Sequence, residues 1–441
     1  MKKIIISIIL TLFLSQLYGI DLTLEKSKEI ALKNNPELLA AKENMLSARA
    51  DKWNSLTQFL PSLQTNASYT TFRPTQTLSS GLSAENSKSY GFTVTQPLFQ
   101  GGKIFLNAQI KNNVEDIQEE NFRSQKLQTI SNVEEKYFNV LKNKELLEIA
   151  KLDLKTSKTN LKIAKTKYES GILSRADYLQ ILSEKSSKDV NFLQMQNLYD
   201  TSLMDLAHYL QVENIENIQE INPDNYKDLL KKIQNLSVEK IEDKANNLQG
   251  IAFEKNPGIN ISQLSLNTAK KTMFMAGGNF LPSLNLSYNK NYSKYDFMDD
   301  YEDSGSITFA ASLPLFPIVD NATSLAEAKH NLKKTEHQYQ SVRDGIKLAT
   351  KSSFVNMVSY AKTVNSAEIA LEQAQETYDQ MQKRFSLGQI SANELLSTQT
   401  MLLSAKNQYI TSFFDFLKSR SSLQQQLGIE DTTKLIKIIN L

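Results

Sequence analysis

Two long stretches of the 441-residue chain contain neither glycine nor proline, the residues that most often end a helix. They run from Lys103 to Glu169 and from Ile346 to Leu387. At about 1.5 Å per residue, the first would form a helix about 100 Å long, far longer than a helix of a globular domain. The whole chain has only 14 glycines and 9 prolines, where average usage gives about 31 and about 22. These counts favour helical rods that pack on one another, and they disfavour a many-stranded sandwich or an α/β barrel.

The chain is also a tandem duplication, because short motifs of its first half return in the same order in its second half. The matching pairs are Asn35-Pro36 with Asn256-Pro257, Phe59–Leu63 with Phe280–Leu284, Pro97–Phe99 with Pro314–Phe316, Gly171 with Gly388, and Leu210 with Leu427. One such match could arise by chance. An ordered series at two offsets, of about 221 and about 217 positions, indicates two copies of one structural unit.

In each copy, the segment that lies between the first helix and the long helical rod has apolar residues at every second position instead of at helical spacing. Mainly apolar residues occupy every second position in Leu63–Tyr69, Tyr90–Val94, Leu284–Tyr288 and Ile307–Leu313. We expect two β-hairpins with one apolar and one neutral polar face, no charges on the strands, and polar tips at 73–88 and 291–304. Such strands are typical of a membrane barrel, and an ordinary soluble hairpin is the alternative. The lone Trp53, on the helix before the first hairpin, is expected to pack against a neighbour.

The strand count constrains the assembly. Two hairpins give four strands, too few to close a transmembrane barrel, and an open edge cannot face lipid because its backbone groups would lack hydrogen-bond partners. Two chains would form an eight-stranded barrel filled by side chains, whereas three would form twelve strands around a lumen. We therefore predict a mainly α fold with a transmembrane β portion. Duplicated long α-helical hairpins form an α-barrel, and four strands per chain contribute to the twelve-stranded β-barrel of a solute-conducting homotrimer.

The N-terminus has the pattern of a cleaved secretory signal. Lys2 and Lys3 precede the apolar run Ile4–Leu14, and Ser15–Gly19 could be cut near Gly19. The run is too short to span a bilayer as a helix, although a retained anchor is the alternative. The chain has no cysteine, which excludes disulfides, thiolate zinc sites, a cysteine nucleophile and a lipidated N-terminal cysteine.

Charge and histidine content predict neither nucleic-acid binding nor catalysis. The 50 basic and 48 acidic residues leave a net charge of only +2, so the chain lacks the excess of positive charge that attracts a nucleic acid. The three histidines, His208, His330 and His337, lack a carboxylate partner and fit exposed helix faces. We expect no catalytic residue, no cofactor and no metal site, so the chain is not predicted to be an enzyme.

These patterns divide the chain into two repeats joined by a polar linker. We expect a signal peptide at 1–19, a first repeat at 20–212, a linker or equatorial segment at 213–247, and a second repeat at 248–441. The first repeat holds a β-hairpin at 60–100 and a helical hairpin at 103–212, and the second holds a β-hairpin at 281–316, a helical hairpin at 320–428 and a C-terminal equatorial tail.

Over essentially its whole mature length, the chain resembles the TolC-like outer-membrane efflux proteins. The motifs that carry the resemblance are Leu22–Glu25, Ala31-Leu32, Asn35-Pro36, the Leu-Pro-Ser-Leu strand entries, Gln96–Gly102, and Tyr168 and Gly171 with Asp177. The resemblance implies a trimer whose β-barrel contacts outer-membrane lipid and whose α-helical tunnel crosses the periplasm. It also implies docking, through a periplasmic adaptor (membrane fusion) protein, onto an inner-membrane RND-type pump or ABC transporter, for drug efflux, metal efflux or type I secretion. The alternative is a periplasmic coiled-coil scaffold or adhesin outside the membrane.

The resemblance also assigns the helical turns to the periplasmic tip, which contacts the adaptor. The residues at these positions are Gly171, Ile172, Leu173, Gly388, Gln389 and Ile390. The alternative is that the two glycines serve only as turns.

The resemblance places a gate just inside this tip, at Asp177, Phe385, Glu394 and Ser397. Three copies of Glu394 could form a negative ring that attracts cations, and Ser397 would weaken a second ring. The alternative for Glu394 is a helix cap. The family's closed gate links an Asp to a Tyr and an Arg, but Phe385 lacks the hydroxyl and Ile390 is no cation. We therefore expect closure to rely on apolar packing of Phe385 and Ile390.

Overall fold

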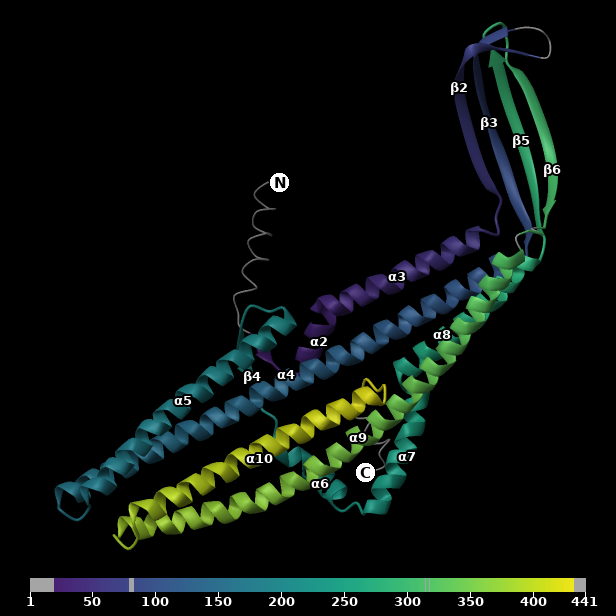
Figure 1. The fold of residues 1–441 in the computed structure, drawn as a ribbon. Helices are drawn as coiled ribbons and strands as arrows, with labels where there is room; N and C mark the ends of the chain where they lie inside the picture. Colours follow the sequence, from purple (N-terminus) through teal and green to yellow (C-terminus); the bar gives the residue numbers. More distant parts are fainter. Residues whose placement is uncertain (1–19, 79–82, 314, 317, 432–441) are drawn as a thin grey trace, which may run out of the picture. The chain divides into compact units, whose positions relative to one another are not determined.

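The computed structural model describes residues 20–78, 83–313, 315–316 and 318–431 (Figure 1). The predicted signal peptide, its cleavage near Gly19 and the end of the predicted C-terminal tail lie outside the described residues. The chain divides into two compact units. We call Met1–Ala41, Phe122–Ile259 and Arg343–Leu441 the coiled-coil unit, and Lys42–Asn121 and Asn260–Val342 the sheet unit. Among the described helices, none is both long and apolar enough to cross a bilayer.

The described elements alternate in the duplicated order that the sequence predicts. They are β1 (Ile20–Leu22), α2 (Leu24–Asn34), α3 (Pro36–Thr57), β2 (Ser62–Thr77), β3 (Ser83–Gln100), α4 (Lys103–Glu169), α5 (Arg175–Leu210), β4 (Ile215–Ile218), η1 (Pro223–Tyr226), α6 (Lys227–Gln234), α7 (Val238–Lys255), α8 (Pro257–Gly277), η2 (Gly278–Phe280), β5 (Ser283–Tyr295), β6 (Glu302–Ser312), α9 (Ile318–Ser386) and α10 (Ala392–Gln426). The rods α4, of 67 residues, and α9, of 69 residues, confirm the long helices.

The repeated Asn-Pro motif separates two helices in each copy. The Asn35 side chain accepts a hydrogen bond from the Leu38 N–H at 3.0 Å, and the Asn256 side chain accepts one from the Gly258 N–H at 2.8 Å. The proline that follows each asparagine is the first residue of the next helix, where its missing N–H has no cost. The motif therefore ends one helix and starts the next.

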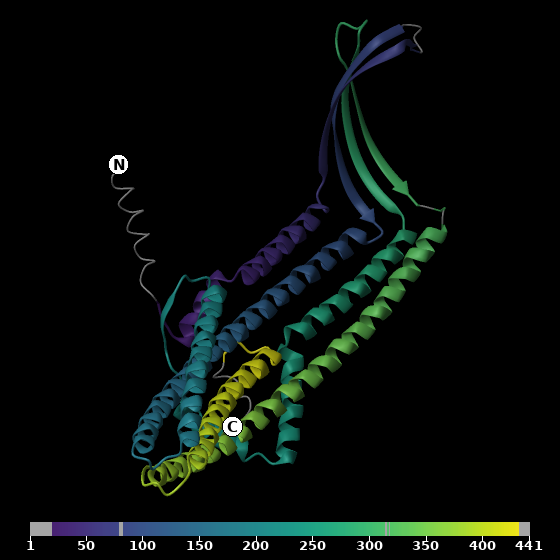
Figure 2. The ribbon, with the colours of Figure 1, turned by 60° about the vertical axis from the view of Figure 1, so that its left-hand side comes forward.

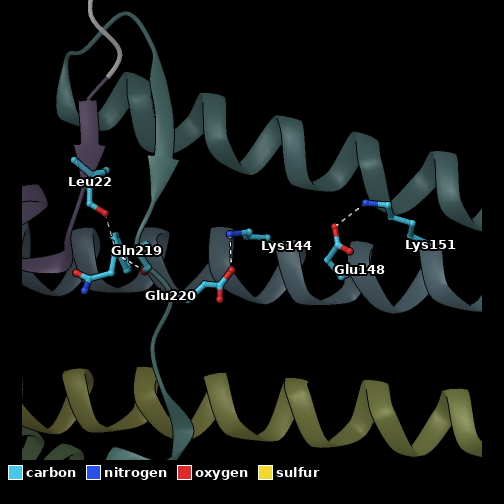
Figure 3. A network of polar contacts seen from close by, with 7 residues as sticks. Leu22, Lys144, Glu148, Lys151, Gln219 and Glu220 are labelled. Carbon is cyan, nitrogen blue, oxygen red and sulfur yellow. Dashed lines mark hydrogen bonds and ion pairs between the residues drawn. The ribbon is translucent and has the colours of Figure 1, made fainter.

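The main apolar core of the coiled-coil unit surrounds a two-stranded parallel sheet formed by β1 and β4. The Tyr137 hydroxyl donates to the Gln219 carbonyl at 2.7 Å and lies 3.2 Å from the Leu22 carbonyl, so one α4 side chain contacts the end of β1 and the residue that follows β4. Close by, the Lys144 ammonium lies 2.6 Å from the Glu220 carboxylate (Figure 3). The carboxylate raises the pKa of Lys144 above its usual range.

The sheet unit contains one antiparallel sheet with the strand order β2-β3-β5-β6, which both ribbon views show side by side (Figure 1, Figure 2). Leu63 lies opposite Val94, Val94 opposite Tyr288, and Tyr288 opposite Ile307. Because directly opposite residues share a face, all four apolar patterns lie on one side of the sheet. The structure thus confirms the predicted alternation.

The strands extend into both segments that we predicted as tips. In the first hairpin β2 continues to Thr77 and β3 begins at Ser83, and in the second β5 continues to Tyr295 and β6 begins at Glu302. The tips are shorter than predicted because ladder hydrogen bonds come from the backbone and do not require an apolar face.

The prediction that the strands carry no charges is also wrong. Lys88, Lys290 and Asp303 lie opposite Tyr69, Phe92 and Tyr292, respectively, on the apolar side of the sheet. Lys290 forms an ion pair with Asp303.

In the sheet unit, ion pairs join α3 to the first half of α4. The Glu115 carboxylate lies 2.8 Å from both the Lys52 ammonium and the Arg49 guanidinium, and these two cations lower its pKa. Trp53 does not pack as expected, because 65% of its surface is exposed in the single chain. Within the described residues, the Trp53 side chain therefore has little cover.

Candidate functional site

Both helical hairpins reverse direction at a glycine in the left-handed conformation. Gly171 has φ of 74° and Gly388 has φ of 76°. The same two backbone bonds close each turn, at 2.9–3.0 Å: Gly171 N–H to Tyr168 O and Ile172 N–H to Lys167 O, then Gly388 N–H to Phe385 O and Gln389 N–H to Arg384 O. This pattern is a Schellman ending, in which a side chain on the glycine would strain the backbone. The duplicated glycines are thus turn residues in both copies.

Serine caps the returning helix in each copy, but only the second cap is reciprocal. The Ser391 hydroxyl accepts from the Glu394 N–H at 3.3 Å, and the Glu394 carboxylate accepts from the Ser391 N–H at 2.7 Å. Hydrogen bonds from the Ser391 N–H and the Ser391 hydroxyl to this carboxylate hold the pKa of Glu394 below its usual range. The Ser174 hydroxyl accepts from the Asp177 N–H at 3.1 Å, and the Asp177 carboxylate bonds that hydroxyl at 2.7 Å rather than the backbone. Aspartate is one methylene shorter than glutamate, which accounts for the difference.

The predicted docking residues divide between solvent and an apolar cluster. Gly171, Ile172, Gly388 and Gln389 are exposed, as is Leu387, which sequence reasoning missed. Leu173 and Ile390 are half-buried and pack against the cluster around Phe385. The two turns therefore present Ile172 and Leu387 as large apolar side chains to solvent.

The cluster around Phe385, here called the tip cluster, joins the two helical hairpins of one chain. Phe385 is only 2% exposed. The buried members come from all four long helices: Ala164 of α4, Ile181 of α5, Ala374, Tyr378 and Phe385 of α9, and Ala392, Leu395 and Leu402 of α10. Of the predicted gate residues, Phe385 is in this cluster, Asp177 is half-buried, and Glu394 and Ser397 are exposed.

Lys167 makes a direct polar link between the two turns. Its ammonium donates to the Phe385 carbonyl at 2.6 Å and lies 4.7 Å from the centre of the Phe385 ring. A lysine in the last turn of a helix commonly bonds carbonyls of that same helix, whereas Lys167 of α4 bonds a carbonyl of α9. Sequence reasoning missed this residue, since no local pattern marks a partner 218 positions away.

A second group that the sequence did not reveal is a buried polar network higher in the four-helix packing. The Lys188 ammonium lies 3.2 Å from Asp153 and 2.8 Å from Glu184. Gln399 donates to Asp153 at 2.6 Å and accepts from Asn160 at 3.3 Å. Burial alone would lower the pKa of Lys188, but the two carboxylates outweigh it and raise that pKa. The network links α4, α5 and α10, and an unpaired charge here would be costly.

The tip has the chemistry of a packing surface that also exposes apolar side chains. Among the described residues, no group of three or more His, Asp or Glu side chains is placed to hold a metal ion. The three histidines are exposed on helix faces, as the sequence predicted. What the tip presents is exposed apolar side chains, capped helix starts and cross-hairpin contacts.

Comparison with known proteins gives consistent matches. The family model described as outer membrane efflux protein matches residues 29–210 and again residues 248–429. The chain is 21% identical to outer membrane protein TolC of Escherichia coli (strain K12) over 421 residues, which cover 92% of this chain and 82% of TolC. It is 21% identical to alkaline protease secretion protein AprF of Pseudomonas aeruginosa over 323 residues, or 72% of this chain and 65% of AprF.

A solved structure shares the fold. The crystal structure of the Campylobacter jejuni CmeC outer membrane channel superposes with a TM-score of 0.78 and 19% identity, covering 94% of this chain and 88% of CmeC. The family model matches most of the chain in two copies, and the architecture of duplicated helical hairpins with a four-stranded sheet agrees with it. The chain therefore belongs to the outer membrane efflux protein family, whose members are channel proteins.

Proposed function

We propose that three copies of this chain form a passive exit duct in the outer membrane. The observation that carries the proposal is the four-stranded sheet, whose edge strands β2 and β6 each pair on one side only within the described chain. An edge in lipid would leave its N–H and C=O groups without partners, so β6 of one copy pairs with β2 of the next until the barrel closes. The apolar face is open in the single chain, with Ile307 76% exposed and Leu63 68% exposed, and lipid covers it in the assembly.

Matching apolar positions on α5 and α9 support the trimer below the membrane. Leu193 and Met204 of α5 and Val355 and Ile369 of α9 are exposed in the single chain. Met204 lies 33 residues after Gly171, and Val355 lies 33 residues before Gly388. Helices that descend to and rise from the same tip place these residues at equal heights, so α5 of one copy covers α9 of the next.

The duct receives its cargo from an inner-membrane pump, of the RND type or an ABC transporter, through a periplasmic adaptor. The six tip residues 171–173 and 388–390, together with Leu387, form the docking surface. This is supported by the exposure of Ile172 and Leu387, because large apolar side chains at a turn favour a protein partner. The name of AprF refers to protease secretion and the family model to efflux, so both kinds of cargo are candidates.

The gate at the tip closes through apolar packing around Phe385 and Ile390, and Lys167 supplies the polar link between the hairpins. The three exposed Glu394 carboxylates form a negative ring at the aperture, and Asp177 and Ser397 lie beside it. The proposal is supported by the burial of Phe385 in the tip cluster and by the low pKa of Glu394, which keeps that carboxylate charged.

The duplicated organisation is part of the proposal. We divide the chain into a signal peptide at 1–19, repeats at 20–212 and 248–441 and a linker at 213–247, which is supported by the two stretches that the family model matches. Helix α7 begins at Val238, ten residues before the second repeat. The duct acts without catalysis, as expected for a channel protein, so we assign no catalytic residue or cofactor.

Two measurements on cells that express the full chain test the duct. Outer-membrane fractions should contain a trimer that dissociates on heating, and vesicles containing this trimer should release small solutes. A periplasmic scaffold or adhesin would instead appear in the soluble periplasmic fraction and would release nothing. Crosslinking followed by pull-down should recover an adaptor and a pump, and replacing both Ile172 and Leu387 by Ser should abolish recovery of the adaptor without changing the trimer.

A further inference from the structure

Two lysines face each other on the lipid side of the sheet. Lys88 of β3 lies directly opposite Lys294 of β5, and Tyr69 of β2 completes the same row. Directly opposed side chains on one face are about 5 Å apart at their β-carbons, and like charges at that separation destabilise a sheet. An anion bound to both ammonium groups would remove this repulsion.

The described part of the chain supplies no ion-pairing carboxylate to Lys88 and Lys294. Within the described residues, no ion pair joins Lys88 or Lys294 to an acid, whereas Lys290 is paired with Asp303. The Lys88 ammonium lies 5.9 Å from the centre of the Tyr69 ring, and the Lys294 ammonium donates to the Asp299 carbonyl. The nearby Asp296 carboxylate accepts from the Glu85 N–H at 3.1 Å. Both ammonium groups therefore keep donors for a further partner.

The position of this lysine row along the sheet identifies the partner. The next row toward the helices holds Tyr90 and Tyr292, whose rings stack at 5.0 Å. The row after it holds Phe92 and Lys290, whose charge is paired with Asp303, and further rows hold Val94, Leu286 and other mainly apolar residues. From Leu284 to Tyr292, eight residues of strand span about 27 Å, or about 20 Å of height at the usual barrel tilt. Apart from the Lys290–Asp303 ion pair, this band is mainly apolar and ends in tyrosines, and its height approaches the about 25 Å of a barrel's apolar band, so the lysine row lies at the level of lipid headgroups.

We propose that Lys88 and Lys294 bind the phosphate of an anionic lipid of the outer leaflet. The turn between β5 and β6 lies at the end of the sheet opposite its helical connections, which makes this the leaflet away from the periplasm. The two ammonium groups donate charge-assisted hydrogen bonds to one phosphate, and the stacked tyrosines contact the start of its acyl chains. This inference rests on the proposed function, since only an inserted sheet meets lipid here.

Native mass spectrometry of the full-length trimer in mixed micelles tests the site, with phosphatidic acid as the phosphate lipid and phosphatidylcholine as the neutral reference. The wild-type trimer should bind phosphatidic acid preferentially. The double variant Lys88→Gln and Lys294→Gln should lose at least about tenfold in apparent affinity for phosphatidic acid, because each lysine near an anionic lipid contributes about fivefold. The double variant Lys88→Arg and Lys294→Arg should keep the preference, since arginine retains the charge.

The matched control removes two charges elsewhere. Lys329 and Lys333 are exposed lysines of α9, so Lys329→Gln with Lys333→Gln should bind phosphatidic acid as the wild type does. Equal lipid binding by the Lys88 and Lys294 glutamine variant and this control would overturn the inference. Displacement of phosphatidic acid by an equal concentration of inorganic phosphate would overturn the lipid assignment. If the wild-type chain forms no trimer and enters no membrane, the proposed function fails, and the lipid site fails with it.

Discussion

The two periplasmic turns have the same backbone and different side chains. Gly171 and Gly388 adopt φ values within 2° of each other and close the same pair of backbone hydrogen bonds. Around the first turn, the exposed Tyr168 stacks at 5.1 Å on the half-buried Tyr178, which packs against the tip cluster. At the second, Phe385 points into the tip cluster and is almost fully buried. Since duplication, the turn geometry has been kept while the means of holding each turn have diverged.

That difference assigns the two hairpins unequal roles at the tip. The second hairpin supplies six of the eight buried members of the tip cluster, whereas the first supplies two and adds the stacked tyrosines and the hydrogen bond from Lys167 to the Phe385 carbonyl. Disturbance of the second turn should therefore loosen both hairpins, and disturbance of the first should remain local.

Replacing Phe385 by Ala should produce the largest effect, because it removes a buried aromatic side chain from the shared cluster at a cost of about 3–5 kcal/mol. Amides of the tip cluster should then exchange hydrogen much faster in the detergent-solubilised trimer, and cells should become sensitive to a bulky antibiotic. Tyr168→Ala, which removes the exposed ring of the tyrosine stack, should cost about 1 kcal/mol and leave antibiotic resistance unchanged. Equal effects of the two variants would contradict the unequal roles.

Replacing Lys167 by Met should cost less, about 1–2 kcal/mol, because the aliphatic stem remains while the charged hydrogen bond to the Phe385 carbonyl is lost. Hydrogen exchange should accelerate in the last turn of α9 and in the last turn of α4 together. Lys165 provides the control, since it points to Glu169 of its own helix at 3.9 Å. If Lys165→Met and Lys167→Met change hydrogen exchange alike, the hydrogen bond from Lys167 to the Phe385 carbonyl does not stabilise the packing of the two hairpins.

The architecture could be predicted from the sequence where one residue type decides local structure. The lack of glycine and proline predicts α4 and α9, and the repeated glycines predict both turns. Features that depend on long-range register could not be predicted. Lys88 meets Lys294 only because β3 pairs with β5, and these strands belong to different copies. Lys167 meets Phe385 because two hairpins pack, which no local pattern in either helix encodes.

The residues that we propose as the gate show where local sequence reasoning succeeds, and a buried polar group shows where it fails. Phe385 and Ile390 were expected to pack because they lack the polar groups of the family's latch, and both belong to the tip cluster or pack against it. The buried group of Asp153, Lys188 and Gln399 was missed, since charged residues on a rod are ordinarily solvated. Burial, which decides whether such a charge is structural, follows from the neighbouring hairpin rather than from the rod itself.

Gly171→Ala and Gly388→Ala should lower the stability of the trimer equally. Equal losses would show that the two turns share one backbone geometry although their side chains differ. A β-carbon added at either glycine would meet no atom within 4 Å, so the only cost is the left-handed conformation, about 1–2 kcal/mol. Thermal dissociation of the trimer should shift by the same amount in both variants. A clearly larger shift for Gly388→Ala would mean that the second turn itself carries strain or support that the first lacks.

The smallest expected difference concerns the caps. Ser391→Ala should cost about 1 kcal/mol and Ser174→Ala somewhat less, because only Ser391 belongs to a reciprocal capping box.

The Glu394 pKa lies below its ordinary value of 4.5, so the charged carboxylate stabilises the start of α10 at neutral pH. That stabilisation should be lost as the pH falls through the lowered pKa, and exchange of the Leu395 amide should accelerate in this range. In Glu394→Gln the side-chain amide keeps the hydrogen bonds without titrating, so the pH step should disappear; a step that persists would assign it to another group.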